Sequence, residues 1–233
     1  PTAHYGMGGV ATDEYGETSV EGLFAIGETM AGVHGANRLG GNSLAETVAY
    51  GVIAGERIAD RVTGPGSIPD SVHDDVVLPH LDELAAMADR DGSHDVHEVF
   101  EALQSLMWRH AGILRDEATL VAGLEELARI RARAADMTTS PTTSESFELA
   151  IDVGFMLTTA EAVLRGALER TESRGAHHRT DHHTTDVDWQ RNVHFEKVDI
   201  GTMTASTHPV GSPSPAVQQA LDDDHELDYH QLE

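Results

Sequence analysis

Three stretches of apolar residues at helical spacing constrain the fold of this chain most strongly. Apolar side chains recur every three or four residues between positions 96 and 107, between 120 and 130, and between 147 and 168. Such spacing gathers the apolar side chains on one face of each helix, and that face must pack against another element. The pattern therefore predicts a three-helix bundle, with a short helix over residues 81–88 beside it. We expect the third helix to begin at Ser144 or Glu145 and Gly175 to be its C′ residue.

A glycine-rich turn precedes another predicted helix near the beginning of the chain. Gly40 and Gly41 come directly before Asn42, and Ser43 and Glu46 have the S-x-x-E spacing of a capping box. The helix is predicted from Ser43 to about Arg61. Its first backbone N–H groups would be unpaired at the positive end of the helix dipole, where they favour an anionic group.

The remaining segments complete the predicted domain organisation. Residues 22–26 are apolar and predict a strand, so residues 1–62 are interpreted as a short α/β piece. Glycines and prolines followed by acidic residues predict a linker over residues 63–80, before a helical domain over residues 81–176. Residues 177–233 contain several prolines and an acidic end, and we expect an irregular segment there with a short helix over residues 216–221.

The charge balance of the chain is strongly acidic. Forty Asp and Glu residues oppose 15 Lys and Arg residues, which gives a net charge of −25, and Lys197 is the only lysine. Such a surface repels nucleic acid, which we therefore exclude as a partner. An acid-rich, lysine-poor composition favours a host with high internal salt, where the Debye length shrinks to about 3 Å at 1 M and self-repulsion is screened.

The composition also excludes several classes of function. The chain has no cysteine, so it offers no disulfide, no thiol nucleophile and no cysteine ligand for an iron–sulfur cluster. It has no apolar run of the roughly 20 residues that a membrane-spanning helix needs, and we expect a soluble protein without direct membrane insertion. A G-x-G-x-x-G fingerprint after a strand, which would bind a dinucleotide pyrophosphate, is also lacking.

Four blocks in a fixed order carry a family resemblance. They are residues 1–10 (PTAHYGMGGV), 22–28 (GLFAIGE), 34–44 (HGANRLGGNSL) and 172–181 (ESRGAHHRTD). Together they resemble the flavoprotein subunits of succinate dehydrogenase and fumarate reductase, with L-aspartate oxidase as a close cousin. The resemblance implies that residues 1–62 are the C-terminal part of an FAD-binding domain. It also implies that the pyrophosphate loop and the capping domain precede Pro1, so the fragment alone should be inactive.

The resemblance assigns roles to six residues. Arg38 and His4 match residues that bind the substrate carboxylates, and an arginine suits this because its planar fork binds a carboxylate bidentately. The residues matching FAD contacts are Glu28, Arg38, Asn42, Ser43 and Leu44. Four of them have a plainer alternative: a surface ion pair for Arg38, a loop residue for His4, a solvated carboxylate for Glu28 and a core position for Leu44. His34 is expected to support the turn.

The resemblance implies the reaction and its partners as well. Succinate would be oxidised to fumarate, or the reverse, by hydride transfer to FAD, as in the tricarboxylic acid cycle and electron transport. Electrons would pass to an iron–sulfur subunit and a quinone, with membrane anchor subunits holding the protein peripherally on the cytoplasmic face of the cell membrane. Gly40 and Gly41 stand where L-aspartate oxidases more often have Ala-Ser, which favours succinate.

Two alternatives of other kinds remain open. A non-catalytic acidic helical scaffold would use the glycine-rich blocks only as turns. The histidines at positions 177, 178, 182 and 183, beside Asp181, have residue types that bind zinc, but the surrounding motif matches a structural one and we predict no metal site. Trp108 and Phe100 are expected in a helix core or a contact between domains.

Overall fold

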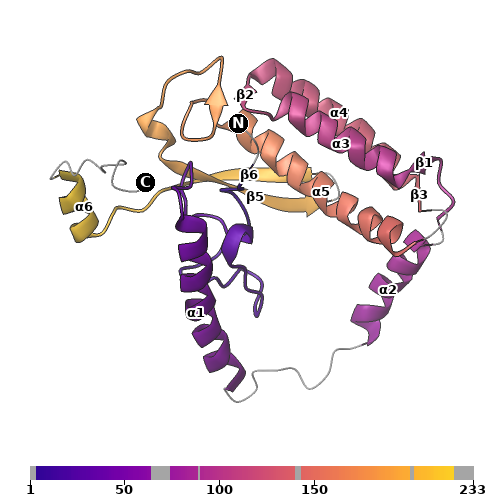
Figure 1. The fold of residues 1–233 in the computed structure, drawn as a ribbon, viewed down its shortest axis with the longest axis horizontal. Helices are drawn as coiled ribbons and strands as arrows, with labels where there is room; N and C mark the ends of the chain where they lie inside the picture. Colours follow the sequence, from indigo (N-terminus) through magenta and orange to yellow (C-terminus); the bar gives the residue numbers. More distant parts are fainter. Residues whose placement is uncertain (1–3, 64–73, 89, 140–142, 200–201, 223–233) are drawn as a thin grey trace.

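The computed structural model describes residues 4–63, 74–88, 90–139, 143–199 and 202–222. Helix α1 (Asn42–Thr63) lies on one side of the molecule, and the helices α3, α4 and α5 lie together on the other (Figure 1). The other elements are η1 (Gly27–Thr29), α2 (Asp74–Ala88), β1 (His94–Asp95), β2 (Leu114–Arg115), β3 (Met137–Thr138), β4 (His178–Arg179), η2 (Val187–Trp189), β5 (Arg191–Asp199), β6 (Thr202–Pro209) and α6 (Pro215–Asp222).

The three helices predicted from apolar spacing are present and pack on one another. They are α3 (Val96–His110), α4 (Glu117–Ala135) and α5 (Ser144–Glu169). The buried side chains that they share form the core: Val96, Val99, Leu103, Leu106, Leu120, Leu127, Ile130, Val153, Leu157 and Leu164. Each helix begins at a capping side chain, which is Asp95, Asp116 or Thr143. Such caps satisfy N–H groups of the first turn that no carbonyl within the helix can reach.

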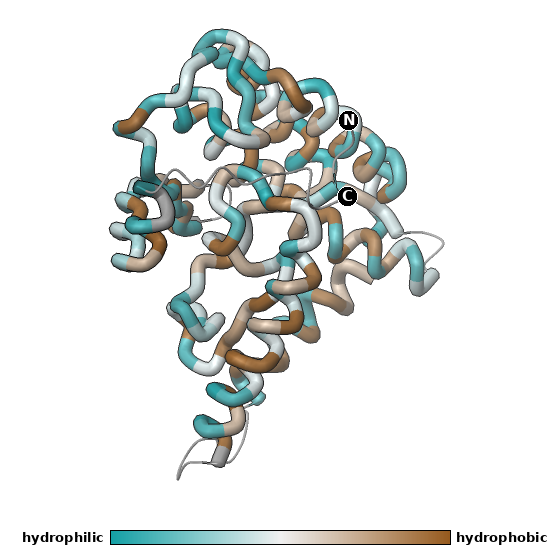
Figure 2. The backbone as a smooth tube through the Cα atoms, turned by 60° about the vertical axis from the view of Figure 1, so that its left-hand side comes forward, coloured by the Kyte–Doolittle hydropathy of each residue, from teal (hydrophilic) through white to brown (hydrophobic). Residues whose placement is uncertain are grey.

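The outer faces of the helices carry both polar and apolar side chains, unlike the apolar core. Figure 2 shows hydrophobic and hydrophilic stretches alternating along the helices, as amphipathic packing requires. Trp108 and Phe155 are nevertheless mostly exposed, so Trp108 is not in the helix core within the described structure, and a contact between domains stays a prediction for it. Phe100 packs against the core. In α1, Leu44, Val48 and Val52 form an exposed apolar face with a four-residue spacing.

Two predictions for the N-terminal half need correction. Residues 22–26 form no strand; Phe24 makes one isolated bridge with Glu17, and the chain turns back at Gly22. Around this bridge the Thr18 N–H donates to the Leu23 carbonyl and the Ala25 N–H donates to the Gly16 carbonyl, both at 2.9 Å. Because the pairing is confined to one bridge among the described residues, the run remains a turn-rich loop. The helix predicted over residues 81–88 begins at Asp74, so part of the predicted linker is helical, and residues 64–73 of that linker lie outside the described residues.

The C-terminal segment is more regular than expected. Strands β5 and β6 form an antiparallel hairpin, and the Phe195 ring on β5 lies against Gly166 of α5. Apolar residues alternate with polar ones along β5, which is the pattern of a half-buried strand, but threonine and serine dilute it in β6. The predicted short helix is confirmed as α6, and residues 223–233 lie outside the described residues.

The segment 172–181 connects the beginning of α4 to the end of α5 through Arg179 and Asp181, and it holds a second buried charge, Glu172. Glu172, which is 0% exposed, accepts hydrogen bonds from Arg170 at 2.7 Å and Arg174 at 2.8 Å. Arg179, which is 1% exposed, donates to both carboxylate oxygens of Asp181 at 2.7 and 2.8 Å. It also donates to the α5 backbone carbonyls of residues 167 and 168, while Asp181 accepts from the first N–H of α4 at 2.8 Å. Breaking buried pairs of this kind typically costs about 3–5 kcal/mol.

Gly175 does not terminate α5. The helix ends at Glu169, and Gly175 instead occupies a turn with φ +56°. A Cβ atom there would lie 2.4 Å from the Ala36 backbone oxygen, and the neighbouring Ala176 N–H donates to that same oxygen at 3.0 Å. A glycine is needed because two backbones meet, so segment 172–181 docks directly on the turn that precedes α1.

Acid is expected to loosen this junction. The Arg179 guanidinium holds the pKa of Asp181 well below its usual range. Burial alone would raise the pKa of Glu172, but the hydrogen bonds from Arg174, the Asp186 amide and Arg170 outweigh burial, so the pKa of Glu172 is also lowered. Both carboxylates therefore bind protons more weakly when folded. Their stabilisation is complete above about pH 5, where both groups are also ionised in the unfolded chain, and it is lost progressively as the pH falls towards the lowered folded-state values. In molar salt, the melting temperature should fall as the pH drops below about 4, and Asp181→Asn should flatten this dependence. A melting temperature that is level from pH 6 to pH 2.5 would contradict it.

Candidate functional site

The glycine-rich turn and the beginning of α1 are arranged as an anion-binding end of a helix. Gly41 has φ +79°, and α1 begins at the next residue, Asn42. The prediction of a helix here is confirmed, but the capping box is wrong. The Glu46 side chain turns away from Ser43: its Oε2 atom bonds to Tyr5 and His34, and its Oε1 atom is buried without a partner.

Tyr5, His34 and Glu46 form a partly buried cluster that we call the Tyr5 cluster. The Tyr5 hydroxyl donates to Glu46 Oε2 at 2.7 Å, and His34 Nε2 lies 2.9 Å from the same oxygen. The Tyr5 and His34 rings meet edge to face, with centroids 5.3 Å apart and planes at 78°. Burial and the Glu46 carboxylate raise the pKa of Tyr5 to about 12, so the phenol keeps its proton and remains a donor.

Arg38 lies over the face of the Tyr5 ring. Its guanidinium carbon is 4.7 Å from the ring centroid, and Nη1 donates to the Leu39 carbonyl at 3.0 Å. The Nε atom of Arg38 is buried and has no hydrogen-bond partner. None of the ion pairs among the described residues involves Arg38. A half-buried cation that lacks a carboxylate partner in so acidic a chain is a candidate ligand for an anionic substrate, and the alternative of a surface ion pair is not observed.

Glu28 and His4 lie on the two segments that flank this cation. Glu28 follows Gly27 in η1, and its Oε1 atom accepts the Gly6 N–H at 2.7 Å, which ties η1 to the segment containing His4 and Tyr5. Both the Glu28 and His4 side chains are exposed. The carboxylate of Glu28 can therefore still accept further hydrogen bonds, and His4 is adjacent in sequence to the ring that carries Arg38.

Asn42, Ser43 and Leu44 make up the first turn of α1. Leu44 is 76% exposed, so it is not a core residue within the described structure. Asn42 is exposed and Ser43 half-buried. The Asn42 and Leu44 N–H groups donate to the Leu39 and Gly41 carbonyls at 3.2 Å, which leaves the Ser43 N–H as the donor that this turn offers to a ligand. The structure thus brings Arg38, Glu28 and the His4–Tyr5 segment together, with the first turn of α1 following the Arg38 turn directly in the chain.

The histidines of segment 172–181 take part in the contacts between this segment and the helices that it connects. His177 Nδ1 lies 3.1 Å from Arg115 Nη1 and its Nε2 lies 3.1 Å from the Arg170 carbonyl. Burial lowers the pKa of His177, which fits a neutral ring that accepts from Arg115 and donates to the carbonyl. Within the parts of the chain that the structure describes, no group of three or more His, Asp or Glu side chains could hold a metal ion.

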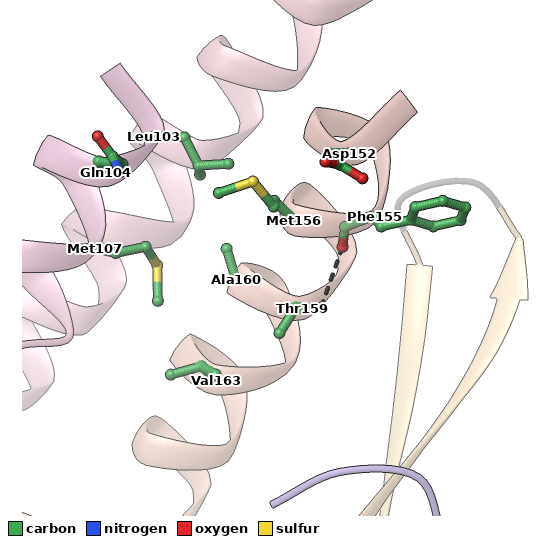
Figure 3. A pocket seen from close by; sticks show the side chains of 9 residues that line it. All are labelled: Leu103, Gln104, Met107, Asp152, Phe155, Met156, Thr159, Ala160 and Val163. Carbon is green, nitrogen blue, oxygen red and sulfur yellow. Dashed lines mark hydrogen bonds between the residues drawn. The ribbon is translucent and has the colours of Figure 1, made fainter. Parts of the chain in front are cut away.

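An apolar pocket lies elsewhere, between α3 and α5 (Figure 3). Its lining is mostly hydrocarbon and sulfur, and Asp152 carries its one charge; the nine residues are Leu103, Gln104, Met107, Asp152, Phe155, Met156, Thr159, Ala160 and Val163. Because it offers no basic side chain, this pocket lacks a counter-charge for a dicarboxylate and is not the candidate site.

The sequence matches two known families over complementary parts. Residues 100–218 match the family described as "Fumarate reductase flavoprotein C-term", and residues 1–44 match "FAD binding domain". The chain belongs to the succinate dehydrogenase and fumarate reductase flavoprotein family. The second match includes Arg38, Glu28 and the start of α1.

Individual members of the family agree with this assignment. The fumarate reductase flavoprotein subunit of Haemophilus influenzae is 36% identical over 186 residues, covering 78% of this chain and 31% of that protein. The flavoprotein in a structure of Escherichia coli quinol fumarate reductase has a TM-score of 0.84 and 31% identity, covering 92% of this chain and 38% of that one. The structure of Mycobacterium smegmatis Sdh1 has a TM-score of 0.83 and 30% identity, covering 98% and 39%. The chain therefore spans less than two-fifths of the length of these family members.

The sequence patterns did not identify Tyr5 or Glu46 as residues of the site, and they predicted for His34 only that it supports the turn. The Tyr5 ring lies under the Arg38 guanidinium, and the Tyr5 hydroxyl contacts His34 and Glu46. These two contacts join residues that are 29 and 41 positions apart in the chain. Glu46 was assigned to a local capping box because its spacing from Ser43 fits one. A partly buried tyrosine next to a histidine and a carboxylate leaves no periodic signal in a single sequence.

Among the described helices, none is long and apolar enough to cross a membrane.

Proposed function

We propose that this chain supplies the C-terminal share of an FAD-dependent active site that interconverts succinate and fumarate. The observation that carries the proposal is the half-buried Arg38 guanidinium, which has no carboxylate partner and lies beside the start of α1. The exposed apolar face of α1 supports it too, because the family members have further FAD-binding sequence that could cover Leu44, Val48 and Val52.

The residues present fit FAD. Gly41 and the following helix start allow a flat or anionic group to approach the Ser43 N–H closely, with Asn42 and Leu44 on either side in that turn. Glu28 keeps acceptor capacity for the ribose hydroxyls after bonding to Gly6. When bound, FAD supplies the acceptor or donor for a hydride.

The substrate is a dicarboxylate, which requires positive or donor groups at both ends. Arg38 can bind one carboxylate through the N–H groups of its two outer nitrogens, in the bidentate arrangement that arginine favours, while its buried Nε atom faces the protein. His4 is placed in the adjoining segment to donate to a carboxylate. These contacts orient the two methylene carbons, so binding energy is used to position the reacting atoms.

The same proposal extends to partners and location. Because this chain has no cysteine, electrons leaving the flavin would pass to clusters in an iron–sulfur subunit. We assign the onward transfer to a quinone and membrane anchor subunits, with this protein peripheral on the cytoplasmic face of the membrane. Support comes from a similar structure that is a quinol fumarate reductase and another that contains UQ1.

Substrate choice tests the function. The whole flavoprotein that carries this segment should oxidise succinate or reduce fumarate. Its kcat/KM for L-aspartate should be at least about a hundredfold lower than for succinate, because burying an unpaired ammonium group is costly. Turnover with succinate, fumarate and L-aspartate is compared on one preparation, with flavin absorbance as the control for loading. Efficient conversion of L-aspartate to iminoaspartate would transfer the assignment to L-aspartate oxidase, and absence of flavin would favour the scaffold.

A further inference from the structure

The contacts of Arg38 raise the question of what fixes its side chain. Arginine has several rotatable bonds, and holding it in one geometry costs conformational entropy. Within the described structure, its guanidinium donates to the carbonyl of the next residue and lies on the face of the Tyr5 ring. The neighbouring carbonyl moves with the turn itself. The Tyr5 ring is therefore the element that can fix the guanidinium relative to the rest of the domain.

Tyr5 is in turn fixed from below by two buried side chains. The side chain of Glu46 is 2% exposed and that of His34 is 6% exposed. Glu46 comes from the first turns of α1 and His34 from the beginning of the Arg38 turn, while Tyr5 lies on the N-terminal segment next to His4. One carboxylate oxygen thus connects three of the segments that carry the proposed ligands, namely those of His4, Arg38 and the first turn of α1.

We infer that Tyr5, His34 and Glu46 are positioning residues that set the orientation of Arg38 for the dicarboxylate. This inference rests on the proposed function. A phenol that donates to a carboxylate is more electron-rich, and a more electron-rich ring face attracts a cation more strongly. The Glu46 bond also prevents the ring from swinging away when a substrate carboxylate pulls on the guanidinium. Glu46 acts through Tyr5 and has no contact with Arg38.

Three variants distinguish the contribution of the Tyr5 ring from that of the hydrogen bond that holds it. Tyr5→Leu removes the surface under Arg38, Tyr5→Phe keeps the ring and removes the hydroxyl, and Glu46→Gln keeps the shape and removes the charge. The matched control is Tyr15→Leu, because Tyr15 carries Arg57 in the same way, at 5.4 Å from the ring centroid. Glu17→Gln is the control for the charge change, since Glu17 pairs with Arg61 outside the Arg38 turn. All are made in the whole flavoprotein.

The readouts are succinate kinetics and the Kd of malonate, a dicarboxylate that cannot be oxidised, followed by the change in flavin absorbance. Tyr5→Leu should raise KM and the malonate Kd about tenfold, and Tyr5→Phe and Glu46→Gln about threefold. The effect on kcat should be smaller, because the ring does not touch the reacting carbons. Both controls should change these constants less than twofold.

A double-mutant cycle distinguishes positioning from general support. In an Arg38→Ala background, Tyr5→Leu and Glu46→Gln should not weaken malonate binding further, because the side chain they position is gone. Equal losses in both backgrounds would mean a merely structural role and would overturn the inference. If Tyr5→Leu loses its flavin, Tyr5→Phe and Glu46→Gln decide by the same comparison. If Arg38→Ala itself binds malonate and turns over normally, the proposed function fails at Arg38, which is a separate result.

Discussion

Replacing Arg38 by alanine should lower kcat/KM for succinate by about a hundredfold or more while the protein keeps its FAD. Losing one partner of a desolvated, hydrogen-bonded charge pair typically costs about 2–5 kcal/mol, and each 1.4 kcal/mol is a factor of ten. Arg38→Lys should recover little of this loss, because an ammonium group cannot reproduce the bidentate fork. Steady-state kinetics and the flavin-to-protein absorbance ratio measure the two effects separately.

Arg57→Ala provides the matched control for Arg38→Ala. Arg57 lies on α1, its guanidinium also lies over a tyrosine ring, and its side chain is half exposed. It should change kcat/KM less than twofold, because surface pairs of this kind contribute little. A near-normal rate for Arg38→Ala would contradict the assignment of this arginine, and loss of flavin together with the rate would make its role one of cofactor binding.

The helical part of the fold could be predicted because its information is local and periodic. The stripes around Leu103, Leu127 and Leu164 repeat at the helical interval, and these residues are buried in the structure. The hairpin of β5 and β6 was not predicted, because the residues of β6 around Ala205 are mostly threonine and serine. Such weakly polar residues show neither the two-residue period of a strand nor the 3.6-residue period of a helix clearly. The strand predicted at residues 22–26 was wrong because an apolar run specifies burial but not a pairing partner.

The candidate site divides in the same way. Arg38, Glu28 and the turn before α1 could be identified from ordered blocks of sequence. The Tyr5 cluster could not, because it depends on contacts between residues far apart in the chain. The wrong capping box shows the physical reason: a short-range rule gave Glu46 a partner at Ser43, whereas tertiary structure offers it a buried phenol and an imidazole. Gly175 is a further example, since its role is set by the backbone of Ala36.

The charge of the chain leads to a prediction of a different kind. At low salt the folded protein should lose structure, because 40 carboxylates are opposed by one lysine and 14 arginines. Much of the positive charge is already committed to particular pairs, such as Arg61 with Glu17, Arg131 with Glu161 and Arg179 with Asp181. Since the net charge is −25, the excess carboxylates have no basic side chain left to neutralise them.

Lowering the salt from molar to tens of millimolar lengthens the Debye length from about 3 Å to beyond 10 Å, so each carboxylate then interacts with several others. The stability of a whole domain is only about 5–15 kcal/mol, and a few tenths of a kcal/mol of repulsion per excess charge suffices to exceed it. We therefore expect the helical circular dichroism signal to fall cooperatively between 3 M and 20 mM salt. Acidification towards about pH 5 should restore part of it by protonating carboxylates, until the loss of the Asp181 and Glu172 bonds below about pH 4 opposes the gain. A signal that is unchanged at 20 mM salt would refute adaptation to high salt and would leave the enzyme assignment intact, because Arg38 and its surroundings do not depend on the surface charge.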